Sequence, residues 1–189
     1  MAEALHEWAR ALDTLHTQVW KRLERGVADR RAPARHPTLA SVDGKGMPQA
    51  RTVVLRAAHH DTASLNIYTD CHADKVSEVR ANPYAALHIW DNIAHLQIRF
   101  STEVVVHTGE ALKSIWEQLS DHAQSCYGFH PASGDVIAES LAYEKYPDLK
   151  AFAMLELSIQ QMDILHLGHR HRRARFQRDD DWAGQWVVP

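Results

Sequence analysis

Two arginines that flank an apolar, β-branched run are the first residues of this sequence with a clear capacity to bind a ligand. Arg51 and Arg56 enclose residues 52–55. Side chains alternate between the faces of a strand, so the two arginines point to opposite sides unless the strand bends or ends between them. A guanidinium is costly to bury without an anion, and its planar fork suits a phosphate. The pattern therefore predicts an anion pocket built from strand ends.

A second segment offers further donors for the same anion. Tyr68 and Thr69 end the next apolar run, and Lys75 lies at the start of a short helical pattern over residues 74–81. A hydroxyl, an ammonium group and the N–H groups of a helix N-terminus all favour an anion. Surface salt bridges to the chain's own carboxylates are the alternative interpretation of the two arginines. The joint pattern favours a phosphate.

The elements that must position these residues are mostly short strands. Apolar residues spaced by three and four predict an amphipathic helix over residues 3–25, followed by a loop over 27–37. Further helices are predicted at 74–81, after Gly109 and at 138–146, with an irregular loop before the last one. Strands are predicted over 38–42, 47–57, 64–69, 84–90, 94–107, 152–160, 163–167, 171–177 and 182–187. Many short antiparallel strands with few helices favour a mainly β fold, a closed or nearly closed β-barrel with flanking helices.

The order of these motifs resembles the pyridoxamine 5′-phosphate oxidase family. The matching elements are the two arginines, Tyr-Thr-Asp at 68–70, Lys75, Ala-Asn-Pro at 81–83, Gln-Ile-Arg at 97–99, and a C-terminal stretch from His169 to Pro189. Each motif is short, but their joint order and spacing are specific. The resemblance covers residues 36–189 and implies an FMN-binding split-barrel domain. Residues 1–35 would add an N-terminal amphipathic helix and loop to the same domain.

The resemblance implies a site for flavin mononucleotide (FMN). Carried over by position, Arg51 and Lys75 correspond to residues that bind the FMN phosphate. Tyr68 and Thr69 correspond to flavin contacts at the end of a strand. Asp74 stands where the family has a second basic residue. We therefore expect FMN as the cofactor.

The remaining site residues lie on other segments. Gln97 corresponds to a glutamine that reaches the flavin ring from the other subunit, and Arg173 to an arginine near the flavin. Arg56 replaces a lysine that touches flavin and substrate, and His171 corresponds to the substrate-side histidine. The resemblance therefore implies a homodimer with FMN at its interface, in which Arg56 and His171 face the substrate.

The substrate pocket departs from the family's pattern. The helix arginine that binds the substrate phosphate corresponds to Leu119, and a C-terminal arginine corresponds to His169. Charge-assisted hydrogen bonds contribute roughly 1.5–3 kcal/mol each, so losing two of them weakens the binding of a phosphorylated substrate by about a thousandfold. The sequence predicts an FMN-dependent oxidoreductase with a diverged small-molecule substrate. A non-catalytic flavin- or haem-binding protein, a carrier or a sensor, is the alternative.

Composition gives no indication of a nucleic-acid or membrane partner. The formal charge is −3, and the Arg-rich run 170–178 is followed at once by three aspartates, which favours a solvated strand face. His166, His169 and His171 could bind a metal or haem, but no Cys or Glu lies at ligand spacing, so we expect no metal. Two cysteines are too few for a disulfide framework, and charged residues interrupt the N-terminal apolar pattern. We expect a cytoplasmic protein.

Overall fold

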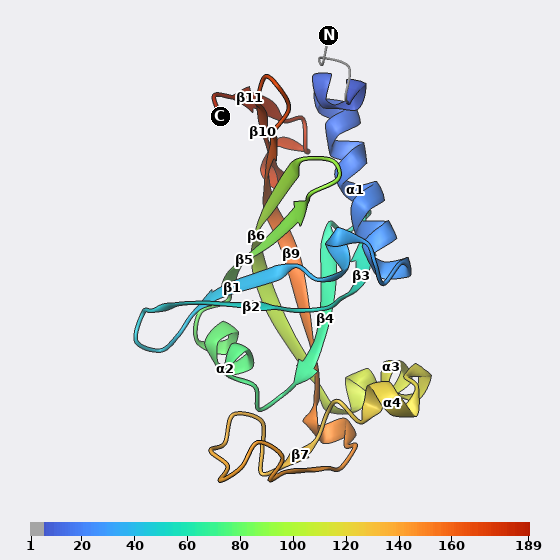
Figure 1. Cartoon of the computed structure of the whole chain (residues 1–189), viewed down its shortest axis with the longest axis vertical. Helices are drawn as coiled ribbons and strands as arrows, with labels where there is room; N and C mark the ends of the chain where they lie inside the picture. The colour runs from blue at the N-terminus through green and yellow to red at the C-terminus, as the bar shows by residue number, and fades with distance from the viewer. Residues whose placement is uncertain (1–5) are drawn as a thin grey trace.

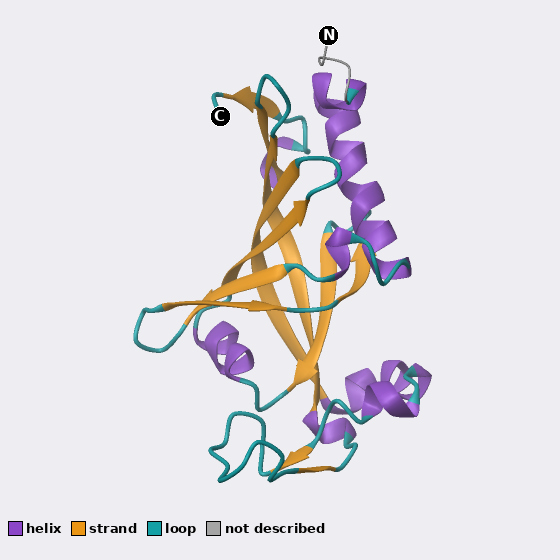
Figure 2. Ribbon diagram, in the orientation of Figure 1, coloured by secondary structure: helices purple, strands orange, loops and turns teal. Residues whose placement is uncertain are grey.

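The computed structural model describes residues 6–189, and its centre is one nine-stranded antiparallel sheet (Figure 1, Figure 2). The strands of this sheet are β1 (Thr38–Val42), β2 (Pro48–Thr52), β3 (Leu55–His59), β4 (Ser64–Asp70), β5 (Tyr84–Asp91), β6 (Leu96–Thr108), β9 (Phe152–His166), β10 (Arg172–Gln177) and β11 (Gln185–Val187). A separate pair is formed by β7 (Phe129–His130) and β8 (Glu144–Lys145). The helices are α1 (Leu12–Ala28), α2 (Asp74–Ala81), α3 (Lys113–Gln118) and α4 (Asp121–Gln124), with 3₁₀ turns at Glu7–Arg10, Pro33–Arg35, Gly109–Leu112, Leu149–Ala151 and Arg178–Asp180.

The sheet divides at β9. One edge of β9 pairs with β6 along its length. The other edge pairs first with β4, at residues 152–158, and then with β10, at residues 161–166. β4 also pairs with β3, whereas β2 pairs with β1 at the far edge of the sheet. The hydrogen-bonded sheet is therefore not closed, but the prediction of a mainly β fold with flanking helices is confirmed.

The strand predicted over residues 47–57 is interrupted. β2 ends at Thr52, β3 begins at Leu55, and the N–H of Val53 donates instead to the carbonyl of Pro37 at 2.9 Å. The two halves pair with different strands, so Arg51 and Arg56 belong to different ladders. The sequence left open that the strand bends or ends between the two arginines, and in the fold it ends there.

The N-terminal helix packs its apolar stripe onto the barrel core. Leu15, Val19 and Leu23 are fully buried, as the spacing predicts. The helix is shorter than expected, because Ala11 is extended and separates α1 from the 3₁₀ turn before it. Leu5, part of the predicted helix, lies outside the described residues.

Several predicted boundaries are wrong. Residues 138–146 form no helix but an open loop that contains β8. Leu141 in this loop is 79% exposed, and a short helix without an apolar face to bury has little to stabilise it. The strands predicted at 152–160 and 163–167 are one continuous strand. The strand predicted to begin at residue 182 begins instead at Gln185, after positive φ angles at Asp181 and Trp182. In the described part of the chain, no helix is long and apolar enough to cross a membrane.

Candidate functional site

Lys75 and Thr69 meet where β4 leads into α2. The Lys75 ammonium donates to the Thr69 hydroxyl at 3.1 Å, and Thr69 is only 7% exposed. Burial and the nearby positive charge of Arg51 hold the pKa of Lys75 below its usual range. Two cations that disfavour each other in a partly buried place are stabilised by an anion between them. The geometry therefore fits the anion pocket predicted from these residues.

Arg51 is anchored beside this pair. Its guanidinium donates to the Ser41 hydroxyl and lies 2.9 Å from a carboxylate oxygen of Glu78, a buried residue of α2. Arg51 therefore does form a salt bridge within the chain, but the pair is largely buried and is not the surface salt bridge of the alternative interpretation. The same contact joins β2 to α2 and fixes the fork of Arg51 near Lys75. Sequence reasoning missed Glu78, because a glutamate between Ser77 and Val79 on a short amphipathic helix gives little indication of its partner.

Arg56 lies in an aromatic environment. Its guanidinium carbon is 5.7 Å from the centroid of the Tyr68 ring, and within residues 6–189 its buried Nε has no hydrogen-bond partner. Burial raises the pKa of Tyr68 and of Tyr127, and the charge of Arg56 opposes both shifts. An unsatisfied guanidinium N–H beside two rings can bind a planar polar ligand. Sequence reasoning missed Tyr127, which lies in an irregular segment and has no neighbouring pattern.

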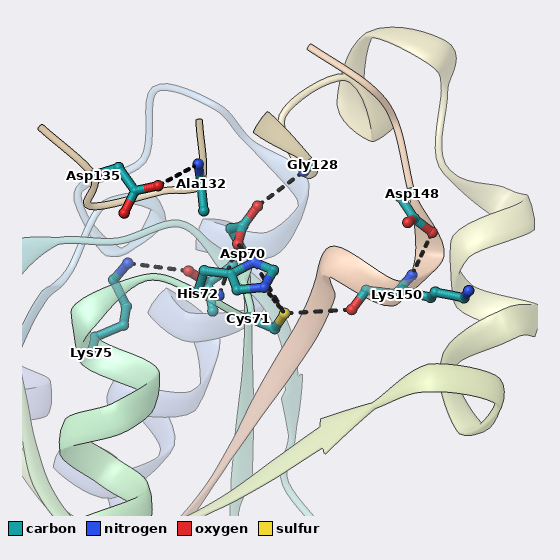
Figure 3. A network of polar contacts seen from close by, with 10 residues as sticks. Asp70, Cys71, His72, Lys75, Gly128, Ala132, Asp135, Asp148 and Lys150 are labelled. Atoms are coloured by element: carbon teal, nitrogen blue, oxygen red, sulfur yellow. Dashed lines mark hydrogen bonds and ion pairs between the residues drawn. The ribbon is translucent and has the colours of Figure 1, made fainter. Parts of the chain in front are cut away.

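Asp70 anchors the backbone of Gly128, the residue after Tyr127 (Figure 3). One Asp70 oxygen accepts from the Gly128 N–H at 2.9 Å, and the other accepts from the His72 N–H at 2.8 Å. Gly128 needs its glycine, because it has φ +97° and an added Cβ would lie 2.0 Å from the Tyr146 carbonyl oxygen. Asp70 therefore ties the loop that follows α4 to the end of β4.

The same residues include a cluster with metal-ligand spacing. Ligand atoms of Asp70, Cys71 and His72 lie within 4.8 Å of one another, the one such group among residues 6–189. Burial and the Asp70 charge raise the pKa of the Cys71 thiol, which disfavours the thiolate that a metal needs. Both Asp70 oxygens already accept hydrogen bonds. The cluster is therefore a loop anchor.

Gln97 and Arg173 form a second group, on the two strands that flank one end of β9. Both are register partners of Leu165, which places them in one row across β6, β9 and β10. Arg173 donates to the buried carboxylate of Asp163 at 2.7 Å, and Arg99 and Arg175 approach the same carboxylate at 3.2 and 3.3 Å. Hydrogen bonds from Arg173 lower the pKa of Asp163. Sequence reasoning missed Asp163, whose signal was an acidic residue inside an apolar strand.

His171 and His169 lie in the connection between β9 and β10, and both are exposed. His171 lines an open pocket of about 530 Å³ together with Arg172, Arg173 and Trp186. His166 lies apart from them, buried at the end of β9 with its Nε2 3.0 Å from Nδ1 of His6. The three histidines that could have formed a ligand set are thus not brought together.

The two groups of predicted site residues are far apart within one chain. Thr69 pairs with Ala153 near one end of β9, and Arg173 pairs with Leu165 near the other. The offset of twelve residues along β9 corresponds to about 40 Å at about 3.3 Å per residue. Figure 1 shows the same separation, with β10 at one end of the molecule and α2 nearer the other. One copy of the chain cannot bring all eight residues to one ligand.

Comparisons with known proteins agree with the fold and the motifs. Residues 17–108 match a family described as "Pyridoxamine 5'-phosphate oxidase, FMN-binding domain". A pyridoxamine 5′-phosphate oxidase-related, FMN-binding protein from Nostoc punctiforme is 26% identical, with a TM-score of 0.76 over 92% of this chain and 96% of that one. PhzG from Burkholderia lata shares the fold, with a TM-score of 0.72 and 19% identity over 93% of this chain and 92% of its own.

Curated pyridoxine/pyridoxamine 5′-phosphate oxidases match over shorter stretches of this chain. The enzyme of Bordetella petrii is 28% identical over 156 residues, which are 80% of this chain and 62% of that protein. The enzyme of Microcystis aeruginosa is 37% identical over 82 residues, 43% of this chain and 37% of that protein. The chain thus spans less than two thirds of the length of these relatives.

Proposed function

Since the chain is a divergent relative of the pyridoxamine 5′-phosphate oxidase-related, FMN-binding split-barrel proteins, we propose that it is a flavoprotein that binds FMN between two copies of itself. The observation that carries the proposal is the pairing of Lys75 with Thr69 beside Arg51 at the end of β4. These residues would hold the phosphate. Arg56 and Tyr68 would lie against the flavin, where the unpartnered Nε of Arg56 could donate to it.

The second copy would complete the site. Gln97 and Arg173 lie about 40 Å along β9 from the phosphate residues of their own chain, at about 3.3 Å per residue. They can contribute to the same flavin only from another copy. Asp163 would hold Arg173 in a fixed orientation. Bound FMN would supply two-electron redox chemistry, and the chain would supply binding and orientation.

The proposed activity is oxidation of a small molecule whose pocket differs from that of the curated relatives. Leu119 packs with Ile115 and Trp116 against the apolar cluster around Tyr127 and Phe152, so the side chain at position 119 offers no cation to a phosphate. His169 is exposed. We propose that Arg56 and His171 face the substrate, and that the substrate is not the phosphorylated vitamer.

The test of the cofactor is a comparison of FMN with riboflavin by titration calorimetry. If Arg51, Lys75 and Thr69 hold the phosphate, FMN binds at least about tenfold more tightly, because one charge-assisted hydrogen bond contributes roughly 1.5–3 kcal/mol. Equal affinities would contradict the proposed phosphate site. The absorption spectrum of the purified protein distinguishes bound flavin from haem directly.

A non-catalytic role in carrying or sensing flavin is the second candidate, and the apolar surroundings of Leu119 favour it. Reduction of bound FMN under anaerobic conditions, followed by reoxidation with oxygen, separates the two candidates. An oxidoreductase turns over with some reduced small molecule, for which a panel of primary amines and alcohols provides the search. A carrier binds FMN and releases it without turnover on any member of the panel.

A further inference from the structure

A cavity of about 370 Å³ lies between α1, the loop after it and the turn that joins β5 to β6. It contains none of the residues assigned to the flavin. Its walls carry four cations, Lys21, Arg22, Arg25 and Arg31, and one carboxylate, Asp91. A cavity of this size accommodates a small molecule, and its charge selects an anion.

Two of the four cations are already neutralised. Arg22 lies 2.9 Å from the Asp91 carboxylate, and Arg25 lies 3.2 Å from that of Asp29. Lys21 and Arg31 form no side-chain ion pair within residues 6–189, and both are exposed. The charge of Arg31 acts on Asp29 without a direct side-chain contact, so two cations that lack an ion-pair partner remain for a ligand.

The cavity also has an aromatic wall. The half-buried Trp8 ring lines it, with the Arg22 guanidinium 4.7 Å from the ring centroid and His6 at 4.8 Å between centroids. Ile89 and Pro33 add apolar surface. A tryptophan ring packs a planar ring at its exposed surface, and the cations that line the cavity suit an acidic substituent on that ring.

The wall formed by the loop after α1 is fixed before any ligand binds. Gly26 allows Ala34 to pass so closely that an added Cβ would lie 2.8 Å from the Ala34 carbonyl carbon. Arg35 donates to the Val27 carbonyl at 2.9 Å, and the Arg31 N–H donates to Asp29 at 2.9 Å. A preformed wall reduces the ordering cost of binding.

The geometry points to a second ligand site in this cavity, for a small aromatic anion, a planar ring that bears a carboxylate or a phosphate. The ring lies against Trp8, and the acidic group lies between Lys21 and Arg31. The site does not depend on flavin binding elsewhere in the chain.

The test is an NMR titration of the purified chain that follows the tryptophan indole N–H signals, with the Trp8 signal assigned from the Trp8→Phe variant. The probes are benzoate, phenyl phosphate, inorganic phosphate and phenol. At least one of the two aromatic anions is expected to shift the Trp8 signal with an affinity at least about tenfold higher than phenol or inorganic phosphate. Which of the two binds more tightly identifies the acidic group. No response of Trp8 to either, or equal binding of phenol or inorganic phosphate, would overturn the proposal.

Charge-matched variants separate this cavity from general electrostatics. Lys21→Ala with Arg31→Ala removes the two unpaired cations, and affinity is expected to fall about tenfold or more. Lys45→Ala with Arg30→Ala removes the same charge from exposed positions outside the cavity, and affinity is expected to stay within about twofold. Lys75→Ala should leave the Trp8 response intact. Equal losses in the two double variants, or loss of the response in Lys75→Ala, would contradict the assignment.

Discussion

At the residue scale, Arg51 has two anionic partners, which are the buried carboxylate of Glu78 and the proposed phosphate. Glu78 is 6% exposed, and removing Arg51 alone would leave its buried charge with no cation and only the hydrogen bond from the Ser41 hydroxyl. Breaking such a pair from one side destabilises a protein by about 3–5 kcal/mol. Arg51→Ala by itself therefore mixes a loss of folding with a loss of binding.

The double variant Arg51→Ala with Glu78→Gln removes both charges and isolates the binding role. It is expected to weaken FMN by roughly 1.5–3 kcal/mol relative to Glu78→Gln alone, and to leave riboflavin nearly unchanged. Calorimetric titration of both ligands provides the measurement. Arg80→Ala, an exposed cation on the same helix, is the matched control and should bind FMN normally. An equal loss for FMN and riboflavin would show that Arg51 does not hold the phosphate.

The leucine at position 119 leads to a prediction about the substrate of the proposed oxidation. The leucine packs in an apolar cluster where a phosphorylated substrate would require a cation, so pyridoxine 5′-phosphate is expected to be a poor substrate. Steady-state kinetics of the unmodified protein should give a kcat/KM below about 10⁴ M⁻¹s⁻¹, the lower end of ordinary enzymes. A higher value would mean that other residues bind the phosphate. Pyridoxine without its phosphate serves as the control for the contribution of that group.

At the scale of elements, the 3₁₀ turn before α1 is attached to the end of β9 through a pair of histidines. His166 is 2% exposed, its Nδ1 has no partner within the described chain, and its Nε2 lies 3.0 Å from His6. Burial, with His6, Arg172, His95 and Arg22 nearby, lowers the pKa of His166 to about 4. This contact therefore requires a neutral His166.

The sign of the resulting pH dependence follows from linkage. A histidine in the unfolded chain titrates near pH 6.5. Between about pH 6.5 and about pH 4, His166 is therefore protonated in the unfolded chain but neutral in the folded chain. Stability is therefore present above that window and falls as the pH is lowered through it, by up to about 3 kcal/mol. Urea unfolding at a series of pH values measures the slope. His166→Gln should flatten it, whereas His169→Gln, at an exposed position, should not. An unchanged slope in His166→Gln would exclude this histidine as the cause.

At the scale of the whole molecule, the separation of the two residue groups predicts complementation between copies. Arg173→Ala removes the contribution from one end of β9, and Lys75→Ala removes a phosphate contact from the other. Each variant alone should bind FMN weakly. In a mixed dimer, one of the two sites regains both unmodified halves, so mixing the two variants should restore part of the tight binding. Binding by the mixture that equals the average of the separate variants would contradict a site shared between copies.

The local pattern of the sequence was sufficient for the strands near the proposed phosphate site. β1 and its turn, the end of β4 and all of α2 follow from alternation, glycine-containing turns and helix periodicity, which are properties of neighbouring residues. The resemblance to a flavin-binding family likewise depends on short motifs in order, and the comparisons support it. The helix predicted over residues 138–146 failed because periodicity cannot report whether an apolar face finds a partner.

Only the tertiary structure decided which distant residues meet. The pairing of Arg51 with Glu78, of Arg173 with Asp163 and of Asp70 with the Gly128 N–H joins segments whose separation along the chain leaves no local trace. The break after Thr52 arises because the first half of one apolar run pairs with β1 and the second half pairs with β4. The length of β9 places the predicted flavin residues at opposite ends of one chain, because a continuous strand is stiff and extended.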